Sequence, residues 1–116
     1  MFFLLFRDLF RDEDFSMYNI SEEDFGYVAN GIDAKMYVIK INNDDVDREI
    51  SKAITYQGYT KAIAVIKFKD FVDDEKVEEI IDAIKDNLEC GASLKYIAKV
   101  DQKLEDEIKV ILIASK

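Results

Sequence analysis

The segment TKAIAVIKF, residues 60–68, is the strongest constraint on how this chain folds. It is an almost continuous apolar run, which is typical of a central strand that is buried on both faces of a sheet. Such a strand requires covering layers, because a sheet buries its apolar faces against other elements. The segment therefore predicts a sheet with helices packed on it.

Other elements alternate around this strand. Branched, aromatic or alternating residues predict further strands over residues 34–41, 92–100 and 107–115. Apolar residues at helical spacing predict helices over residues 1–11, 22–30 and 73–89, with another after Asn43 or Asp44 that ends before Gly58. The order predicts an α/β (α+β sandwich) fold with a mixed four-stranded sheet, parallel crossovers and a hairpin of the last two strands.

Length and charge limit the classes of partner. The chain has 116 residues, which suits a single domain over residues 1–116. Its 25 acidic and 16 basic residues give a net charge of −9. Most of such a surface repels polyanions, so we expect neither nucleic acid nor an anionic membrane as a partner. A basic protein, a cation or a neutral protein surface fits better.

Missing residue types exclude several chemistries. There is no histidine and a single cysteine, Cys90, so the chain lacks a Ser–His or Cys–His pair and the ligands of a zinc site. The four glycines are scattered and form no phosphate-binding loop. We therefore expect no catalytic residues, no metal and no cofactor. A lone cysteine favours a reducing, cytoplasmic location, and we expect Cys90 to be a buried or half-buried filler.

The N-terminal segment is more apolar than one sheet face can bury. Its apolar side chains surround the predicted helix, yet the run MFFLLF is too short to span a membrane. The alternatives are a helix laid across the core and a helix whose remaining face is a protein interface, as in a homo-oligomer. The candidate interface residues are Phe2, Phe3, Phe6, Leu9 and Phe10.

The C-terminal half resembles the second domain of FtsZ, the bacterial and archaeal relative of tubulin. The resemblance rests on a buried strand followed by the acidic helix DDEKVEEIIDAI and by the closing segment DEIKVILIA, residues 106–114. It covers about residues 15–116, and REISKAI is similar to the helix that precedes the strand. The resemblance implies that residues 1–14 correspond to the end of the FtsZ central helix, while the GTP-binding domain has no counterpart here.

The stretch YNISEEDF, residues 18–25, falls on a functional loop in this resemblance. In FtsZ the loop has the form Asn-x-Asp-x-x-Asp and enters the next subunit's nucleotide pocket, where it helps to hydrolyse GTP. Asn19 and Asp24 match the asparagine and the second aspartate, whereas Ser21 replaces the first aspartate. A serine suits a helix cap but lacks the negative charge, so the resemblance implies a partner loop without catalytic power.

Three hypotheses from different classes follow. The first is a non-catalytic interaction module that binds an FtsZ-type GTPase and regulates its filaments or cell division. The second is a self-associating homodimer unrelated to filaments. The third is a small-molecule enzyme with a cleft between subunits, where the basic residues available are Arg7, Arg11, Lys95 and Lys99.

Overall fold

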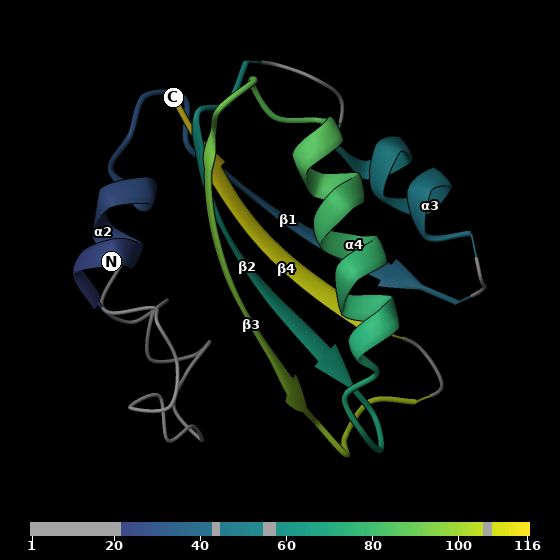
Figure 1. Ribbon diagram of the computed structural model, residues 1–116. Helices are drawn as coiled ribbons and strands as arrows, with labels where there is room; N and C mark the ends of the chain where they lie inside the picture. The colour runs from purple at the N-terminus through teal and green to yellow at the C-terminus, as the bar shows by residue number, and fades with distance from the viewer. Residues whose placement is uncertain (1–21, 43–44, 55–57, 106–107) are drawn as a thin grey trace.

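The computed structural model describes residues 22–42, 45–54, 58–105 and 108–116 (Figure 1). The predicted helix over residues 1–11 lies outside these ranges. The predicted strands and the three later helices are confirmed to within three residues at most boundaries, although the third helix ends earlier, at Ala53. In chain order the elements are α2 (Glu22–Ala29), β1 (Lys35–Ile41), α3 (Val46–Ala53), β2 (Lys61–Phe68), α4 (Asp74–Asp86), β3 (Ser93–Val100) and β4 (Ile108–Ser115).

The four strands form one mixed sheet in the order β1-β4-β2-β3. The pair β2 and β3 is parallel, as predicted for strands joined by a helix, here α4. The predicted hairpin of the last two strands is wrong, because β2 lies between β3 and β4. Instead, β4 is antiparallel to both β1 and β2.

Burial explains why β4 takes a central place and β3 an edge. Six consecutive residues of β4, from Val110 to Ser115, are buried, and an internal strand is covered on both faces. In β3 only Ile97 is buried, and Lys95 is exposed. Lysines and exposed side chains are common on edge strands, where they discourage pairing with other chains.

Helices cover the two faces of the sheet unequally. In Figure 1, α3 and α4 lie side by side on one face, which we call the helix-pair face, and α2 lies on the opposite face, the α2 face. The main core lies under α3 and α4, where Ile50, Ile80 and Ile84 have no exposed surface. Fully burying each of these side chains contributes roughly 1.5–3 kcal/mol to the free energy of unfolding.

Aspartates cap the two helices of the helix-pair face. The Asp45 carboxylate accepts a hydrogen bond from the backbone N–H of Arg48 at 3.1 Å, and Asp73 accepts from the N–H of Glu75 at 3.1 Å. The cap of α3 is therefore Asp45, one residue later than the sequence predicts. The acids at these helix starts complement the helix dipole, as expected.

The helices in the part of the chain that the structure describes are all too short or too polar to span a membrane.

Candidate interaction surfaces

Surfaces of the described residues that can meet a partner include the region around α2, the remainder of the α2 face, and the acidic outer side of α3 and α4. The helix α2 contacts β4 and β2 at the end of the sheet where β4 ends and β2 begins. Val28 is buried at this contact. Tyr27 lies under the ammonium of Lys61, which is 4.1 Å from the ring centroid. A cation–π contact at an exposed site contributes roughly 0.5–1 kcal/mol.

The turn after α2 approaches the sheet closely at Gly31. A Cβ atom at this position would lie 2.7 Å from Cβ of Ser115 and 2.8 Å from Cε of Lys61. Real Cβ atoms essentially never come this close, so a side chain here would push α2 away from β4. Glycine therefore fixes how closely α2 approaches the sheet.

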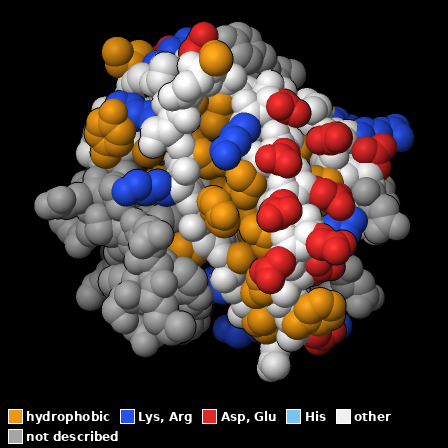
Figure 2. Space-filling model, in the orientation of Figure 1, with side chains coloured by type: hydrophobic (Ala, Val, Ile, Leu, Met, Phe, Trp, Pro, Cys, Tyr) orange, Lys and Arg blue, Asp and Glu red, His pale blue; other side chains and the backbone are white. Residues whose placement is uncertain are grey.

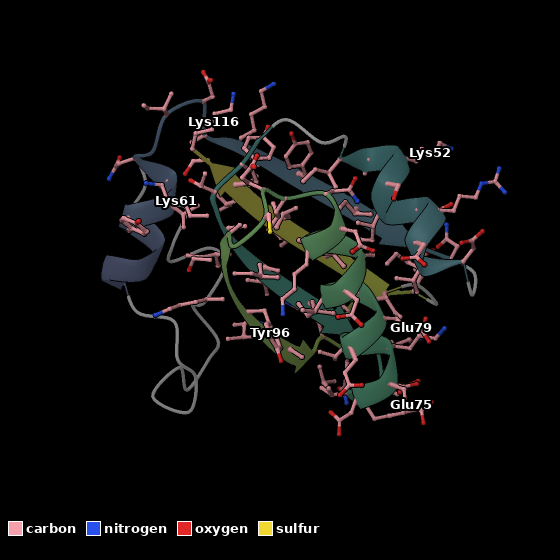
Figure 3. All side chains as sticks on the ribbon, turned by 45° about the horizontal axis from the view of Figure 1, so that its top comes forward. Lys52, Lys61, Glu75, Glu79, Tyr96 and Lys116 are labelled. Atoms are coloured by element: carbon pink, nitrogen blue, oxygen red, sulfur yellow. The ribbon has the colours of Figure 1, made fainter. Side chains whose placement is uncertain are left out.

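The C-terminal residue holds the same turn. The backbone N–H of Lys116 donates to the carbonyl of Ile32 at 2.8 Å, and the N–H of Ile32 donates back to the carbonyl of Lys116 at 3.1 Å. The Lys116 ammonium also lies 3.5 Å from the Asp33 carboxylate. Figure 3 shows Lys61 beside α2 and Lys116 at the same end of the sheet. These contacts fix the C-terminal end of α2 in place.

The structure describes only part of the predicted partner loop. Asp24 is the third residue of α2, so its backbone belongs to the helix that the sheet holds. Asn19 and Ser21 lie outside the described residues, and so do the interface candidates Phe2, Phe3, Phe6, Leu9 and Phe10. The loop and the N-terminal interface stay predictions.

A row of four lysines crosses the α2 face. Strand register aligns Lys40 of β1 with Lys109 of β4, Lys109 with Lys67 of β2, and Lys67 with Lys99 of β3. Cross-strand partners project from the same face of a sheet, and Lys67 lies between two residues of the helix-pair core, Ile66 and Phe68. The row is therefore on the α2 face, where the Lys67 ammonium lies 3.8 Å from the Asp101 carboxylate.

Sequence reasoning missed this lysine row. The four residues are separated by up to 69 positions, from Lys40 to Lys109, and only the register brings them together. In a chain with a net charge of −9, the row concentrates positive charge on one face of the sheet.

Negative charge gathers on the other side of the molecule. Figure 2 shows carboxylates along the whole exposed side of α4. A groove of about 280 Å³ between α3 and α4 is lined by Asp45, Val46, Asp47, Glu79, Asp82 and Asp86. In the described ranges no group of three or more acids or cysteines has the spacing to hold a metal ion. The structure thus offers an acidic surface, without a geometry that identifies a bound cation.

Cys90 lies in the turn between α4 and β3 and is exposed. The expectation of a buried or half-buried filler is wrong. The reason is that α4 ends at Asp86 and not at residue 89, so Cys90 follows the helix in a turn at the surface.

Comparisons with known proteins find similarity in structure but none in sequence. No protein-family model matches the sequence, and no curated protein matches it. An FtsZ dimer from M. jannaschii matches the structure with a TM-score of 0.68 and 19% identity, over 84% of this chain and 31% of that chain. The chain has an FtsZ-like fold.

Other solved structures agree. A point mutant of the M. jannaschii FtsZ gives a TM-score of 0.68 at 20% identity, over 84% of this chain and 32% of that chain. CetZ from Methanosaeta thermophila gives 0.51 at 13% identity, over 80% of this chain and 29% of that one. The chain therefore spans about a third of the proteins it matches, and the FtsZ-like fold is confirmed for that part.

Proposed function

We propose that this chain is a non-catalytic, FtsZ-like interaction module that binds FtsZ-type filaments and regulates their assembly in cell division. The observation that carries the proposal is the FtsZ-like fold, which covers 84% of this chain but only 31% of the FtsZ chain. In addition, the 116 residues contain no glycine-rich phosphate loop. A chain with part of the FtsZ architecture and no nucleotide signature is suited to meet a filament subunit without hydrolysing GTP itself.

The contact that we propose is made by the start of α2. The resemblance to FtsZ assigns Asn19, Ser21 and Asp24 to the loop that enters a neighbour's nucleotide pocket. Asp24 belongs to α2, whose far end is held by the close approach at Gly31 and by the paired backbones of Ile32 and Lys116. A helix fixed in this way presents its first turn with little freedom, which lowers the entropy lost on binding.

Binding without catalysis follows from the residue at position 21. Activation of water beside a phosphate requires a carboxylate or a comparable base, and a serine hydroxyl is a far weaker one. An occupied pocket with Ser21 in place of the aspartate would therefore turn over GTP slowly. Under this proposal the chain acts in the cytoplasm on a protein partner and needs no cofactor.

Cosedimentation tests the binding step. FtsZ from the same cell is polymerised with GTP and pelleted with increasing amounts of this protein. We expect the protein to pellet with the polymer, and Asp24→Ala to weaken this by roughly tenfold or more. Asp47→Ala is the matched control, because Asp47 is an exposed acid on α3, a helix of the opposite face.

One outcome would contradict the proposal, and a second would then favour the homodimer. If the wild-type protein stays in the supernatant at every concentration, it does not bind the filament. If sedimentation equilibrium then shows a dimer that Phe3→Asp and Phe6→Asp dissociate, the chain is a self-associating protein unrelated to filaments.

A further inference from the structure

The edge strand β3 leaves an uncharged apolar strip on the helix-pair face. Strand register places Leu94, Tyr96, Ala98 and Val100 in rows with Ala62, Ala64, Ile66 and Phe68, all of which belong to the helix-pair core. We call these four β3 residues the β3 shelf. Tyr96 keeps 45% of its surface exposed and Val100 keeps 40%, whereas their partners on β2 are buried. Figure 2 shows apolar side chains running beside the acidic side of α4, with a basic side chain among them in the upper part.

The exposure follows from how the helices cover the sheet. In Figure 1, α3 and α4 lie over β1, β4 and β2, and β3 extends beyond α4. The lysines of β3, Lys95 and Lys99, alternate with the shelf residues and so project from the α2 face. The shelf consequently has no charge of its own, because both lysines of β3 are on the other face.

An acidic row borders the shelf. Asp74, Glu78 and Asp82 are exposed and follow each other at four-residue spacing, so they form one line along α4. Glu79, Asp82 and Asp86 line the groove toward α3, and Figure 3 shows Glu75 and Glu79 projecting away from β3. By helical periodicity, Asp74 and Glu78 are on the opposite flank, toward β3, and Asp82 is near the crest between the two flanks.

One basic residue interrupts this border. Lys85 lies on the same flank one turn beyond Asp82 and is exposed. The acidic border is therefore limited to Asp74 and Glu78, in the N-terminal half of α4. That part of the helix runs beside the exposed residues of the shelf (Figures 2 and 3).

We propose that the β3 shelf is a docking surface for a basic amphipathic helix of a partner protein. Tyr96 and Val100 are four residues apart on a strand, about 13 Å, which is close to the length of two helical turns, about 11 Å. Two apolar residues two turns apart on the partner helix can therefore contact both. Lysines or arginines on its flank would meet Asp74 and Glu78.

Charge selects this occupant over a second copy of the chain. The protein carries a net charge of −9, so two copies repel each other, whereas a basic helix is attracted to the acidic border. The shelf is on the face opposite α2. A partner on the shelf and a filament subunit at α2 can therefore bind at the same time, and either interaction can fail without the other.

The test is an NMR titration of the isotope-labelled protein with synthetic helical peptides of about 15 residues. One peptide has a leucine stripe and lysines at all other positions, and the second has glutamates in place of the lysines. We expect the lysine peptide to shift backbone amides of β3 and of the N-terminal half of α4, and the glutamate peptide to leave them unchanged. Shifts confined to the groove lined by Asp45 and Asp47 would overturn the proposal.

Matched variants separate docking from general attraction between charges. Tyr96→Ser should weaken binding of the lysine peptide by at least about tenfold, whereas Val38→Ser should not, because Val38 is similarly exposed but on the α2 face. Asp74→Lys should weaken binding of the lysine peptide several-fold more than Glu75→Lys, which makes the same charge change in the same helical turn. Equal effects of the paired variants would show that the shelf is not the binding surface.

Discussion

The hydroxyl of Tyr59 lies 2.7 Å from the hydroxyl of Tyr37, and their rings meet edge to face with centroids 6.4 Å apart. Tyr37 is on β1 and Tyr59 lies two residues before the start of β2, so the pair joins segments that are not neighbours in the sheet. Tyr59 has no exposed surface. The hydrogen bond therefore gives its polar atom a partner inside the core, where an unpartnered hydroxyl would be costly.

Removing this hydrogen bond should lower stability. We expect Tyr59→Phe to reduce the free energy of unfolding by about 1 kcal/mol, because the partly buried hydroxyl of Tyr37 then loses a partner. Urea denaturation of Tyr59→Phe, of Tyr37→Phe and of the double variant measures this loss. A double variant that costs as much as the sum of the single variants would contradict coupling between the hydroxyls.

The same pair predicts a loss of stability at high pH. Burial, and then the hydrogen bond with Tyr37 and the nearby charge of Asp33, raise the pKa of Tyr59 to about 12. In the unfolded chain a tyrosine pKa is about 10. Below about pH 10 both states keep the proton and the contribution is fully present; between about pH 10 and 12 only the unfolded state releases it, so stability falls by roughly 2–3 kcal/mol.

Lysines also titrate in this range, so the measured quantity is the difference between the wild type and Tyr59→Phe. The wild type should be the more stable protein below about pH 10, and the difference should fall and change sign as the pH rises to 12. A difference that is constant over this range would mean that Tyr59 is not protected from ionisation in the folded state.

The order of the strands predicts that truncating side chains along one row of the sheet lowers the free energy of unfolding by unequal amounts. Leu112 of β4 and Tyr96 of β3 both flank Ala64 of β2, yet Leu112 has no exposed surface and Tyr96 keeps 45%. Leu112→Ala should cost about 2–5 kcal/mol, and Tyr96→Ala clearly less. Thermal and urea unfolding measure both. Equal costs would be incompatible with β4 inside the sheet and β3 at its edge.

Gly31 should not accept a side chain. We expect Gly31→Ala to destabilise the protein by about 1–3 kcal/mol, because the new methyl group would overlap Ser115 at the contact between α2 and the sheet. Hydrogen exchange should show the loss first in the amides of α2. Ser115→Gly in the same chain should restore part of the stability, and no restoration would mean that the overlap is not the cause.

Local features of the sequence predicted much of the fold, and the pairing of distant segments supplied the rest. The apolar run of β2 and the apolar stripe of α4 predicted buried elements, and both are buried. The predicted hairpin was wrong because closeness in sequence favoured pairing β3 with β4. The apolar residues of β4 are instead buried by its position between β1 and β2. Strand pairing is a tertiary property that a short segment does not contain.

The candidate surfaces also divide into one that a local motif predicted and others that depend on strand pairing. Asp24 was found through a sequence resemblance, since its position in a short motif is local. The lysine row and the β3 shelf depend on register and on which strand is left uncovered by α4, so sequence periodicity alone could not reveal them. The alternation of Leu94, Tyr96, Ala98 and Val100 was visible in the sequence, but their exposure was not.

The most direct test of the proposed function is GTP turnover and polymer mass of FtsZ from the same cell, titrated with this protein. The account predicts that the wild-type protein changes both quantities, that Asp24→Ala abolishes the change, and that Asp47→Ala keeps it. Unchanged turnover and polymer mass at saturating concentrations of folded protein would contradict the account, and the chain would then share the FtsZ-like fold without acting on the filament.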